Sequence, residues 1–348
     1  MAGGALREPE ALTAMAEKAV RPETVQRITS AVFPAFALLG ALELDLFSRF
    51  AAGPRSAAEI ARETGWSADK LDRLLHALAA SGLLLAQGEG RFANTPEGER
   101  YLIRGRPDDL GEARLIFRDA WESCLKTAQS VRCAEAQAKH DFEAMDESEL
   151  ERFLRGLAPG AAASASALAR QADFTRVKRI ADVGGGSGAL AAALCQRFEA
   201  LRASVFELPA VVPVTRRLLA ERDQTGRVEV RAADLANEPM PGPFDAAVLR
   251  NFLQIFDAAG AARALANVAA GVRPGGAIYV LGIGVLDDSR LAPTEAALFD
   301  LVFLNVYDGG RCYTEAEYRR FAEAAGLTGF ARVTLEGGYG LITLRTPG

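Results

Sequence analysis

A glycine-rich turn at residues 184–188 (GGGSG) carries the clearest chemical signal in the sequence. It follows a short apolar strand, residues 180–183, and precedes a predicted helix from Ala189 to Phe198. Glycine allows a sharp turn and lets a ligand approach the backbone, because it has no Cβ. The helix behind the turn adds free N–H groups and the positive end of its dipole. This order of elements is typical of a nucleotide-type cofactor site at the carboxyl end of a parallel sheet.

Three later strands indicate which cofactor the turn favours. The spacing alone does not exclude NAD, because Ala189 at the sixth position is a tolerated variant of the dinucleotide fingerprint. Glu207, however, ends a second strand about 20 residues further on, where a carboxylate can bind ribose hydroxyls. Asp234 and Leu235 follow a third strand at adenine distance, and the fourth strand leads to Arg250. Together these elements favour S-adenosylmethionine (SAM).

Five stretches carry a resemblance to a known family. They are Asp182-Val-Gly-Gly-Gly-Ser-Gly188, Phe206-Glu-Leu-Pro209, Ala233-Asp-Leu235, Val248-Leu-Arg-Asn251 and Val272-Arg-Pro-Gly-Gly276. With them, residues 179–345 resemble the catalytic domain of the small-molecule O-methyltransferases of the caffeate and acetylserotonin type. The family fold is α/β and Rossmann-like, with a seven-stranded sheet whose last strand, here Gly340–Arg345, is antiparallel. The resemblance extends to the N-terminal third of the chain.

The resemblance implies that the chain binds SAM at the carboxyl ends of these strands. Glu207 would hold the ribose, Asp234 with Leu235 would hold the adenine, and the glycine turn would hold the methionine end. The residues expected to bind the cofactor are Asp182, Gly184, Gly186, Glu207, Leu208, Asp234, Leu235 and Arg250. The implied activity is that of a SAM-dependent methyltransferase acting on a small metabolite.

The residues that remove a proton in this family are missing from the sequence. In the caffeate-type enzymes a His-Asp-Trp motif after the fourth strand supplies the base, but the corresponding positions here hold Gln254 and Ile255. Gly282 and Cys312 align with the two glutamates that orient the family's histidine. A glutamine amide cannot take a proton near neutral pH, although it can donate and accept hydrogen bonds. We therefore expect Gln254 to orient the acceptor rather than deprotonate it.

Several functions remain open without that histidine. The favoured interpretation is O-methylation of an acidic phenol or enol, for which alignment with SAM is sufficient. The alternatives within the fold are methylation of carbon or nitrogen, and a reaction that uses SAM without methyl transfer. The simpler role for Gln254 is packing or hydrogen bonding at the pocket edge. A different class of function is a winged-helix regulator that senses SAM or a metabolite.

The acceptor pocket is expected over a helix that spans residues 295–307. Aromatic side chains fall on one face of this helix at helical spacing, and Phe252 would close the floor of the pocket. The predicted pocket residues are Phe252, Phe299, Phe303 and Tyr307. An aromatic pocket with few charges suits a flat, largely apolar metabolite.

Few residues are able to replace the missing base. The two histidines are His76, expected to pack inside the N-terminal domain, and His140, which lies in a segment that contributes to the acceptor wall in the resembling family. Asp308 and Tyr313 flank a glycine turn and are placed to reach the acceptor. Asp257 is expected instead to cap the helix that follows it. The candidate catalytic residues are therefore Gln254, His140 and Asp308.

The length of 348 residues suggests two domains and a bridge. Residues 1–105 are predicted to form a winged-helix dimerisation domain, residues 106–172 a helical bridge that contributes to the acceptor pocket, and residues 173–348 the SAM-binding domain. In the resembling family this domain dimerises, which implies that the apolar helix over residues 31–50 joins two copies into a homodimer. The small-residue run at 158–167 is expected to be a flexible start to the helix that enters the last domain.

The winged-helix pattern, residues 57–103, raises the question of DNA binding, because related motifs bind DNA. The helix in the recognition position balances Asp69 and Asp72 against Lys70 and Arg73, and no basic arm flanks it. DNA-binding domains need a basic face to neutralise phosphates. The sequence therefore favours a dimer-forming role for this domain over a nucleic-acid partner.

The bulk properties of the chain point in the same direction. A net charge of −5 argues against nucleic acid and anionic membranes as partners. The four cysteines lack metal-ligand spacing, which predicts free thiols in a reducing compartment and no metal site. Met1–Val20 has no apolar signal core, and Ala31–Leu42 is too short to span a bilayer. We expect a cytoplasmic protein whose partners are a small-molecule acceptor and a second copy of itself.

Overall fold

The computed structural model describes residues 21–222 and 226–348 of the chain. The chain divides into two compact units, Met1–Arg104 and Gly105–Gly348. The segment predicted to be a bridge, residues 106–172, belongs to the second unit. The expectation for Met1–Val20 lies outside the described residues.

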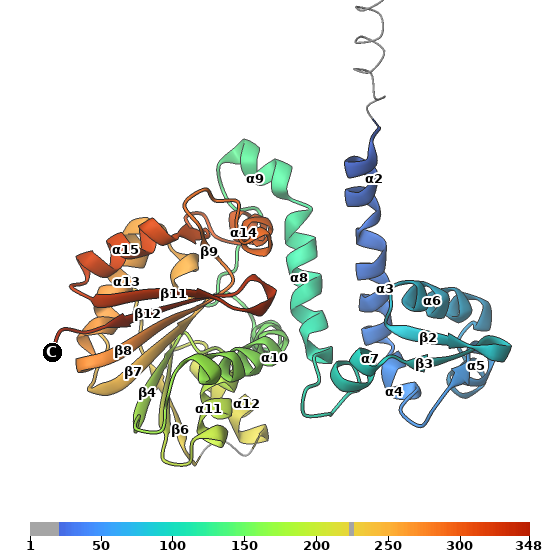
Figure 1. Cartoon of the computed structure of the whole chain (residues 1–348), viewed down its shortest axis with the longest axis horizontal. Coiled ribbons are helices and arrows are strands. Elements are labelled where there is room, and N and C mark those ends of the chain that lie inside the picture. Colours follow the sequence, from blue (N-terminus) through green and yellow to red (C-terminus); the bar gives the residue numbers. More distant parts are fainter. Residues whose placement is uncertain (1–20, 223–225) are drawn as a thin grey trace, which may run out of the picture. The chain divides into compact units, whose positions relative to one another are not determined.

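The first unit is helical, with a small antiparallel sheet of order β1-β3-β2 (Figure 1). Its elements are α2 (Glu23–Ser30), α3 (Val32–Glu43), α4 (Leu46–Arg49), β1 (Arg55–Ser56), α5 (Ala57–Thr64), α6 (Ala68–Ala80), β2 (Leu84–Gln87), η1 (Gly88–Gly90), β3 (Arg91–Asn94) and α7 (Pro96–Tyr101). Ser56 forms a reciprocal capping box with Glu59 at the start of α5, and Ser67 caps α6. These caps give partners to helix N–H groups that would otherwise have none.

The first helices of the described chain differ from the prediction. α2 and α3 join end to end over Glu23–Glu43, whereas the sequence predicted one helix over residues 31–50. The chain breaks instead at Asp45, whose φ of 52° lies in the left-handed region. By length and composition the joined helix is able to cross a membrane, which the shorter apolar run inside it is not. Ile28 and Phe33 are 61% and 69% exposed, so this helix presents an apolar surface.

The second unit holds the remaining elements. They are η2 (Gly111–Ala113), α8 (Arg114–Cys124), α9 (Thr127–Cys133), α10 (Glu147–Gln171), β4 (Arg179–Val183), α11 (Ala189–Arg197), β5 (Arg202–Glu207), α12 (Val212–Glu221), β6 (Val228–Ala232), β7 (Phe244–Arg250), η3 (Leu253–Ile255), α13 (Ala258–Ala270), β8 (Val272–Gly282), β9 (Val285–Leu286), α14 (Thr294–Val306), β10 (Tyr313–Thr314), α15 (Glu315–Ala324), β11 (Thr328–Thr334), η4 (Glu336–Gly338) and β12 (Gly340–Arg345).

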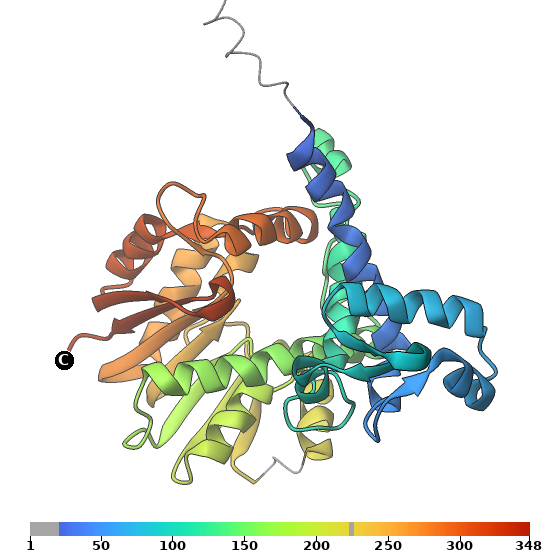
Figure 2. The ribbon, with the colours of Figure 1, turned by 45° about the vertical axis from the view of Figure 1, so that its right-hand side comes forward.

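A seven-stranded sheet of order β11-β12-β8-β7-β4-β5-β6 forms the centre of this unit. The pairs from β8 to β6 are parallel, and β12 is antiparallel to both of its neighbours, which confirms the predicted fold. α10, α11 and α12 cover one face of the sheet, and α13 and α15 cover the other (Figures 1 and 2). Alternate residues of β4 follow this division, since Ile180 packs toward the first group of helices and Ala181 toward the second.

The strand order reverses between β4 and β7, which are neighbours in the sheet. From β4 the chain continues through β5 and β6 to one side, and then returns to build β7 and β8 on the other side. Loops that leave the carboxyl ends of two such strands run in opposite directions and open a crevice between them. The residues that end β4, β5 and β7 therefore meet at the edge where a ligand is expected.

The helix α10 is longer and more regular than the sequence suggested. It runs for 25 residues through Pro159, so the run at 158–167 lies in its middle and is not a flexible start. Ala158, Ala161 and Ala165 are buried in the core together with residues of α11. Their small side chains let the two helices approach closely, and that packing outweighs the hydrogen bond lost at proline.

Candidate active site

The glycine turn between β4 and α11 forms a cradle, residues 184–188, that depends on its glycines. Gly184, Gly186 and Gly188 have φ of 60°, 57° and 71°, which disfavours residues with a Cβ. A Cβ on Gly184 would lie 2.6 Å from Cδ2 of Phe252. The ring of Phe252 therefore packs directly against the backbone of the turn, and the Gly184 and Gly188 N–H groups donate to the carbonyls of Phe206 and Gly185.

Glu207 joins the end of β5 to the cradle. Its Oε1 accepts a hydrogen bond from the Gly186 N–H (2.7 Å), and its Oε2 accepts one from the Leu208 N–H (3.1 Å). Burial raises the pKa of the Glu207 carboxyl to about 7, although the two hydrogen bonds act to lower it. Each carboxylate oxygen keeps a lone pair for a further donor, such as a ribose hydroxyl.

Asp182 lies beneath the cradle rather than on its surface. It is 1% exposed, and its Oδ2 accepts a hydrogen bond from the Ala191 N–H (3.2 Å). Burial raises the pKa of the Asp182 carboxyl to about 7. Its Oδ1 is buried without a hydrogen-bond partner among the described residues. Asp182 thus supports the first turn of α11 and contributes negative charge under the crevice.

Arg250 brings a buried cation to the same edge of the sheet. Its Nε donates a hydrogen bond to Oγ of Ser164 on α10 (2.9 Å), and Ser164 in turn donates to the Gly160 carbonyl (2.8 Å). Burial lowers the pKa of the Arg250 guanidinium, while Tyr339 and Asp182 act in the opposite direction. The sequence predicted Arg250 but not Ser164 or Tyr339, because neither lies in a motif.

Two residues assigned to the adenine have other partners in the structure. Leu235 is 3% exposed and packs in the core, and its contact with adenine stays a prediction. Asp234 accepts hydrogen bonds from the Ala236 N–H (3.2 Å) and from Nδ2 of Asn237 (2.7 Å), which stabilise its own turn. Leu208 is half-buried and packs near α10.

Gln254 lies under the floor of the site, which corrects the expectation that it contacts the acceptor. It is 0% exposed, and its Nε2 is 3.4 Å from the Ile283 carbonyl oxygen. A Cβ on Gly284 would lie 3.2 Å from Cγ of Gln254 and 2.9 Å from Sγ of Cys312. The amide is therefore enclosed by backbone and by a thiol, which sequence spacing cannot reveal.

Among the described residues, the groups beside Gln254 are a thiol and a hydroxyl, and Oδ1 of Asp300 accepts a hydrogen bond from the Cys312 N–H (2.5 Å). Oδ1 of Asn251 fills the place where a side chain at Gly282 would begin. Burial raises the pKa of the Cys312 thiol and that of the Tyr318 hydroxyl. The positions that align with the family's proton relay are thus packed and uncharged.

An aromatic row crosses the second unit from α14 to α10. Its members are Phe299, Phe303, Tyr307, His140 and Phe153. Successive ring centroids are separated by 5.5 Å, 6.2 Å, 5.9 Å and 4.9 Å. Three of these residues were predicted to line the acceptor pocket, and the structure brings them together on one side of α14. Phe252, the predicted floor, packs against Phe256 and the cradle.

His140 is the catalytic candidate that the structure places in this row. Its side chain is 8% exposed, and its Nε2 lies 3.0 Å from Oδ2 of Asp119 on α8. His76, which was expected to pack in the first unit, is instead 64% exposed beside Asp72, with only its ring edge against Phe92. His76 is exposed because it falls just outside the apolar stripe of α6.

The other proposed replacements for the base do not reach the aromatic row. Asp308 is 53% exposed, pairs with Lys139 (2.7 Å) and accepts a hydrogen bond from the Ala136 N–H (2.9 Å). Tyr313 is fully buried and donates its hydroxyl proton to the Phe256 carbonyl (2.6 Å). Asp257 caps α13 through the Gly260 N–H, as the sequence predicted.

Asn305 connects α14 to α9, and no sequence motif marks this residue. This side chain is 0% exposed. Its Oδ1 accepts a hydrogen bond from Oγ of Ser130 (2.8 Å), and its Nδ2 donates to Oγ1 of Thr127 (2.9 Å) and to the Leu301 carbonyl (2.7 Å). Its backbone carbonyl accepts from the Ala138 N–H (2.9 Å). These bonds fix the end of α14 from which Tyr307 projects.

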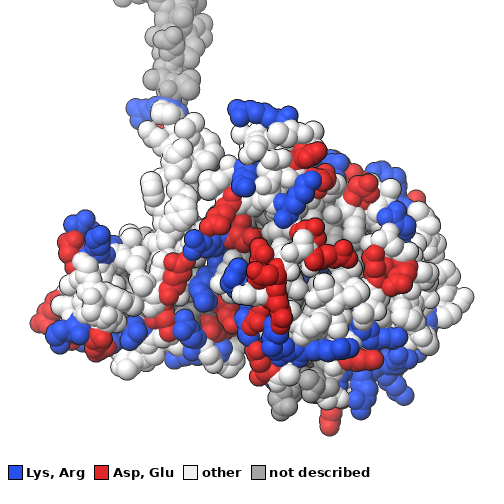
Figure 3. All heavy atoms as spheres, turned by 180° about the vertical axis from the view of Figure 1, so that it is seen from behind, with Lys and Arg blue, Asp and Glu red and all other residues white. Residues whose placement is uncertain are grey.

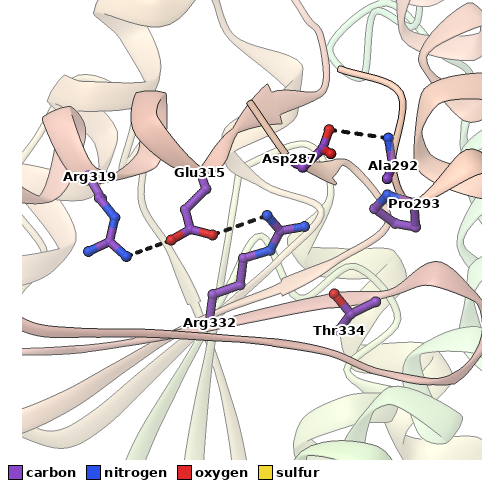
Figure 4. A pocket seen from close by; sticks show the side chains of 7 residues that line it. All are labelled: Asp287, Ala292, Pro293, Glu315, Arg319, Arg332 and Thr334. Atoms are coloured by element: carbon purple, nitrogen blue, oxygen red, sulfur yellow. Dashed lines mark hydrogen bonds and ion pairs between the residues drawn. The ribbon is translucent and has the colours of Figure 1, made fainter. Parts of the chain in front are cut away.

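A second cavity of about 590 Å³ contains none of the cradle residues (Figure 4). It is lined by Asp287, Ala292, Pro293, Glu315, Arg319, Arg332 and Thr334. Arg319 and Arg332 both bind Glu315, and Asp287 accepts a hydrogen bond from the Ala292 N–H. Its charges are therefore paired within its own wall, and it offers no free charge to a ligand.

The fold and the cradle define a doubly wound enzyme with a nucleotide-type cofactor site. Residues 129–328 match the model of the O-methyltransferase domain, and residues 27–104 match that of the O-methyltransferase dimerisation domain. The chain belongs to this O-methyltransferase family.

Relatives with assigned reactions match over most of their length. A 3-hydroxy-5-methyl-1-naphthoate 3-O-methyltransferase of Streptomyces sahachiroi is 32% identical, over 88% of this chain and 89% of the relative. The tetracenomycin polyketide synthesis 8-O-methyl transferase of Streptomyces glaucescens is 29% identical, over 94% and 97%. The solved structure of the SAM-dependent methyltransferase SibL is 25% identical, with a TM-score of 0.73 over 94% of this chain and 100% of that one.

The cofactor of this enzyme is SAM, and the residues present fit it. The cradle has no Cβ in the way of a ligand, and Glu207 offers lone pairs to a ribose. Asp182 and Glu207 also give the crevice a negative character that suits a sulfonium cation.

Proposed function

We propose that this protein methylates a hydroxyl group on a flat aromatic or conjugated metabolite, without the histidine that serves as base in caffeate-type enzymes. The main observation behind this proposal is that α10 contacts the intact cofactor cradle and also contributes a residue to the aromatic row. Leu154 lies 3.4 Å from the point where a Cβ on Gly186 would stand, and the neighbouring Phe153 ends the row. The two relatives named above act on a hydroxynaphthoate and in tetracenomycin synthesis, which supports an aromatic acceptor.

The chain's own residues hold the two reactants and exclude water. Glu207 and the cradle bind the adenosyl and methionine parts, and Arg250 closes the crevice between β7 and α10. When bound, SAM supplies an electrophilic methyl group. Phe303 and Tyr307 offer flat apolar surface to the acceptor, which aligns its oxygen and keeps solvent away. Gln254 supports this floor from beneath.

We also propose that the working form is a cytoplasmic homodimer in which a second copy covers the apolar surface of α2 and α3. The match to a dimerisation domain over residues 27–104 supports a protein partner for this surface rather than lipid. On the face seen in Figure 3, Lys and Arg are interspersed with Asp and Glu, and the helix beside the grey atoms is largely uncharged.

The proposal is tested first by calorimetric titration with SAM, S-adenosylhomocysteine and NAD, followed by a labelled-methyl screen against hydroxylated naphthoates, quinones and polycyclic phenols. We expect micromolar binding of the first two ligands only, and label on an oxygen of at least one acceptor. Label on nitrogen or carbon, or release of S-adenosylhomocysteine without a methylated product, would overturn the O-methylation assignment. Binding of SAM without any turnover, with DNA retarded in a gel-shift assay, would support the regulator instead.

A further inference from the structure

We propose that His140, oriented by Asp119, accepts the proton of the acceptor hydroxyl during methyl transfer. This inference rests on the proposed function and specifies how the site works without the family's histidine. The pair lies on segments that the sequence motifs do not mark: His140 follows α9, and Asp119 lies on α8. A histidine whose second nitrogen faces a carboxylate is the arrangement by which proteins orient a general base.

The position of His140 is fixed from several sides. Its backbone N–H donates a hydrogen bond to the Val306 carbonyl (3.2 Å), which ties it to the end of α14. Its ring stands edge-to-face on Phe153 and on Tyr307, at interplanar angles of 74° and 89°. Phe142 lies on a further side, 6.2 Å away between centroids. An imidazole held in this way does not need to be ordered when the substrate arrives.

The free nitrogen of His140 is the observation that indicates a ligand. Nε2 lies 3.0 Å from Oδ2 of Asp119, and both this Oδ2 and Nδ1 are buried without a hydrogen-bond partner among the described residues. Buried polar atoms in native proteins nearly always have a partner, because an unpaired one costs free energy. In the proposed reaction the acceptor hydroxyl is the missing partner of Nδ1.

The pair is connected to the cofactor cradle by one layer of side chains. Phe153, which contacts His140, packs in a cluster with Leu154 and Leu208. Leu154 approaches the cradle at Gly186, and Leu208 directly follows Glu207. His140 therefore lies at the α10 end of the aromatic row, the end that the contacts through Phe153 and Leu154 link to the cradle.

The other groups around the aromatic row do not compete for the proton. Burial and the negative charge of Asp119 raise the pKa of the Tyr307 hydroxyl, and burial raises that of Cys312. Asp308 faces solvent and pairs with Lys139, and that contact lowers its carboxyl pKa. Imidazole, in contrast, is the side chain that exchanges a proton near neutral pH.

The step balances as follows. The acceptor O–H bond breaks, and its proton goes to Nδ1 of His140. An oxygen lone pair forms the new bond to the methyl carbon, while the carbon–sulfur bond breaks and its electron pair stays on sulfur, which gives S-adenosylhomocysteine. The carboxylate of Asp119 balances the charge of the imidazolium, which afterwards loses its proton to solvent.

Turnover of phenols that differ in acidity distinguishes proton transfer to His140 from a purely structural role of this residue. His140→Gln keeps a polar side chain of similar length, and we expect it to lower turnover of a weakly acidic phenol by about 100-fold or more. Turnover of a nitrophenol that is already ionised in solution is expected to fall by less than about threefold, because no proton has to be removed. Asp119→Asn should show the same graded pattern, and His76→Gln should match the wild type. An equal loss across all phenols would overturn the proposal.

A spectroscopic measurement tests the pair without turnover. The chain has two histidines, so ¹⁵N-labelled His76→Gln protein reports His140 alone by NMR. At alkaline pH we expect the proton on Nε2 and an unprotonated Nδ1, and a shift toward the other tautomer when Asp119→Ala is added. A proton on Nδ1 in the parent protein would overturn the proposal. If the wild type methylates no phenol, the proposed function fails while this measurement still decides the state of the pair.

Discussion

At the scale of single residues, two buried carboxyl groups set how the free protein responds to pH. The pKa of Glu207 is raised from 4.5 to about 7, and that of Asp182 from 3.8 to about 7. A raised pKa means that the folded state binds the proton more tightly than the unfolded state does. The stabilising contribution is therefore complete below about pH 4 and is lost as the pH rises through 7.

Glu207→Gln removes one of these charges and gives the first prediction. We expect the free variant to be more heat-stable than the wild type at pH 8 but not at pH 4, because only at pH 8 does the wild type carry the buried charge. We also expect SAM binding to weaken by about tenfold or more, since a charged acceptor of ribose hydroxyls is lost. Thermal melts at both pH values and calorimetry check this. The exposed Glu199→Gln is the matched control, and equal stability shifts at both pH values would contradict the prediction.

Gln254→Ala tests the corrected position of this amide. Because Gln254 lies under the floor, we expect turnover to fall by about tenfold or less, together with a loss of stability of about 1–3 kcal/mol from the cavity left behind. Steady-state kinetics and denaturant unfolding measure the two effects. The exposed Gln129→Ala on α9 should change neither. A loss of several orders of magnitude in turnover with normal stability would show that Gln254 contacts the reacting atoms.

The sequence predicted the residues whose role is local and missed those whose role depends on tertiary packing. Gly184 and Gly186 were found because a turn needs positive φ at fixed spacing, which a short motif encodes. Leu235 and Gln254 follow strands at the correct edge of the sheet, and for that reason they were predicted to contact ligands. The exposure of their side chains, however, depends on the residues that pack over them. Asp119 was not considered, since its partner lies 21 residues away on another element.

At the scale of elements, α14 is held from one end by hydrogen bonds through Asn305. We predict that Asn305→Leu raises the KM for the acceptor by about tenfold while the Kd for SAM stays within about twofold, because Tyr307 loses its anchor but the cradle is untouched. The variant also removes the hydrogen bonds that Asn305 makes with the hydroxyls of Ser130 and Thr127, at a cost of about 1–3 kcal/mol. Kinetics at saturating SAM and calorimetry separate the effects. Leu304→Ala, one residue away and exposed, is the control, and an equal loss of SAM affinity would refute the assignment.

The boundaries of elements were predicted well where caps or glycine turns mark them. α5 and α6 begin after Ser56 and Ser67, and β12 spans Gly340–Arg345 as expected. The errors occur where no such mark exists. Small residues around Pro159 resemble a linker in composition, yet α10 continues through them because they fit closely against a neighbouring helix. The end of α3 was misplaced for the same reason, since Asp45 carries no obvious stop signal.

At the scale of the whole molecule, the first unit presents more apolar surface than a free monomer needs. We predict that Phe33→Asp converts a dimer to a monomer in light-scattering measurements, because a charge in the centre of an apolar interface loses its hydration. Val333→Asp, at an exposed position of β11 in the second unit, should leave the oligomeric state unchanged. A wild type that is already monomeric, or a Phe33→Asp variant that remains a dimer, would place the interface elsewhere.

The fold class was predictable at this scale because the order of strands and motifs is written along the chain. The sequence did not predict that the segment before β4 belongs to the same compact unit as the sheet. That assignment depends on contacts between α8, α10 and α14. Those contacts create the aromatic row, and no linear pattern joins Phe153 to Phe299.

Phe153 and Leu154 are neighbours on α10, yet one packs on the acceptor side and the other on the cofactor side. A ligand that orders this helical turn from one side reduces the entropy that the second ligand must remove. We therefore expect the two substrates of this enzyme to bind with positive cooperativity. Thermodynamic linkage then requires that each substrate increases the affinity for the other by the same factor.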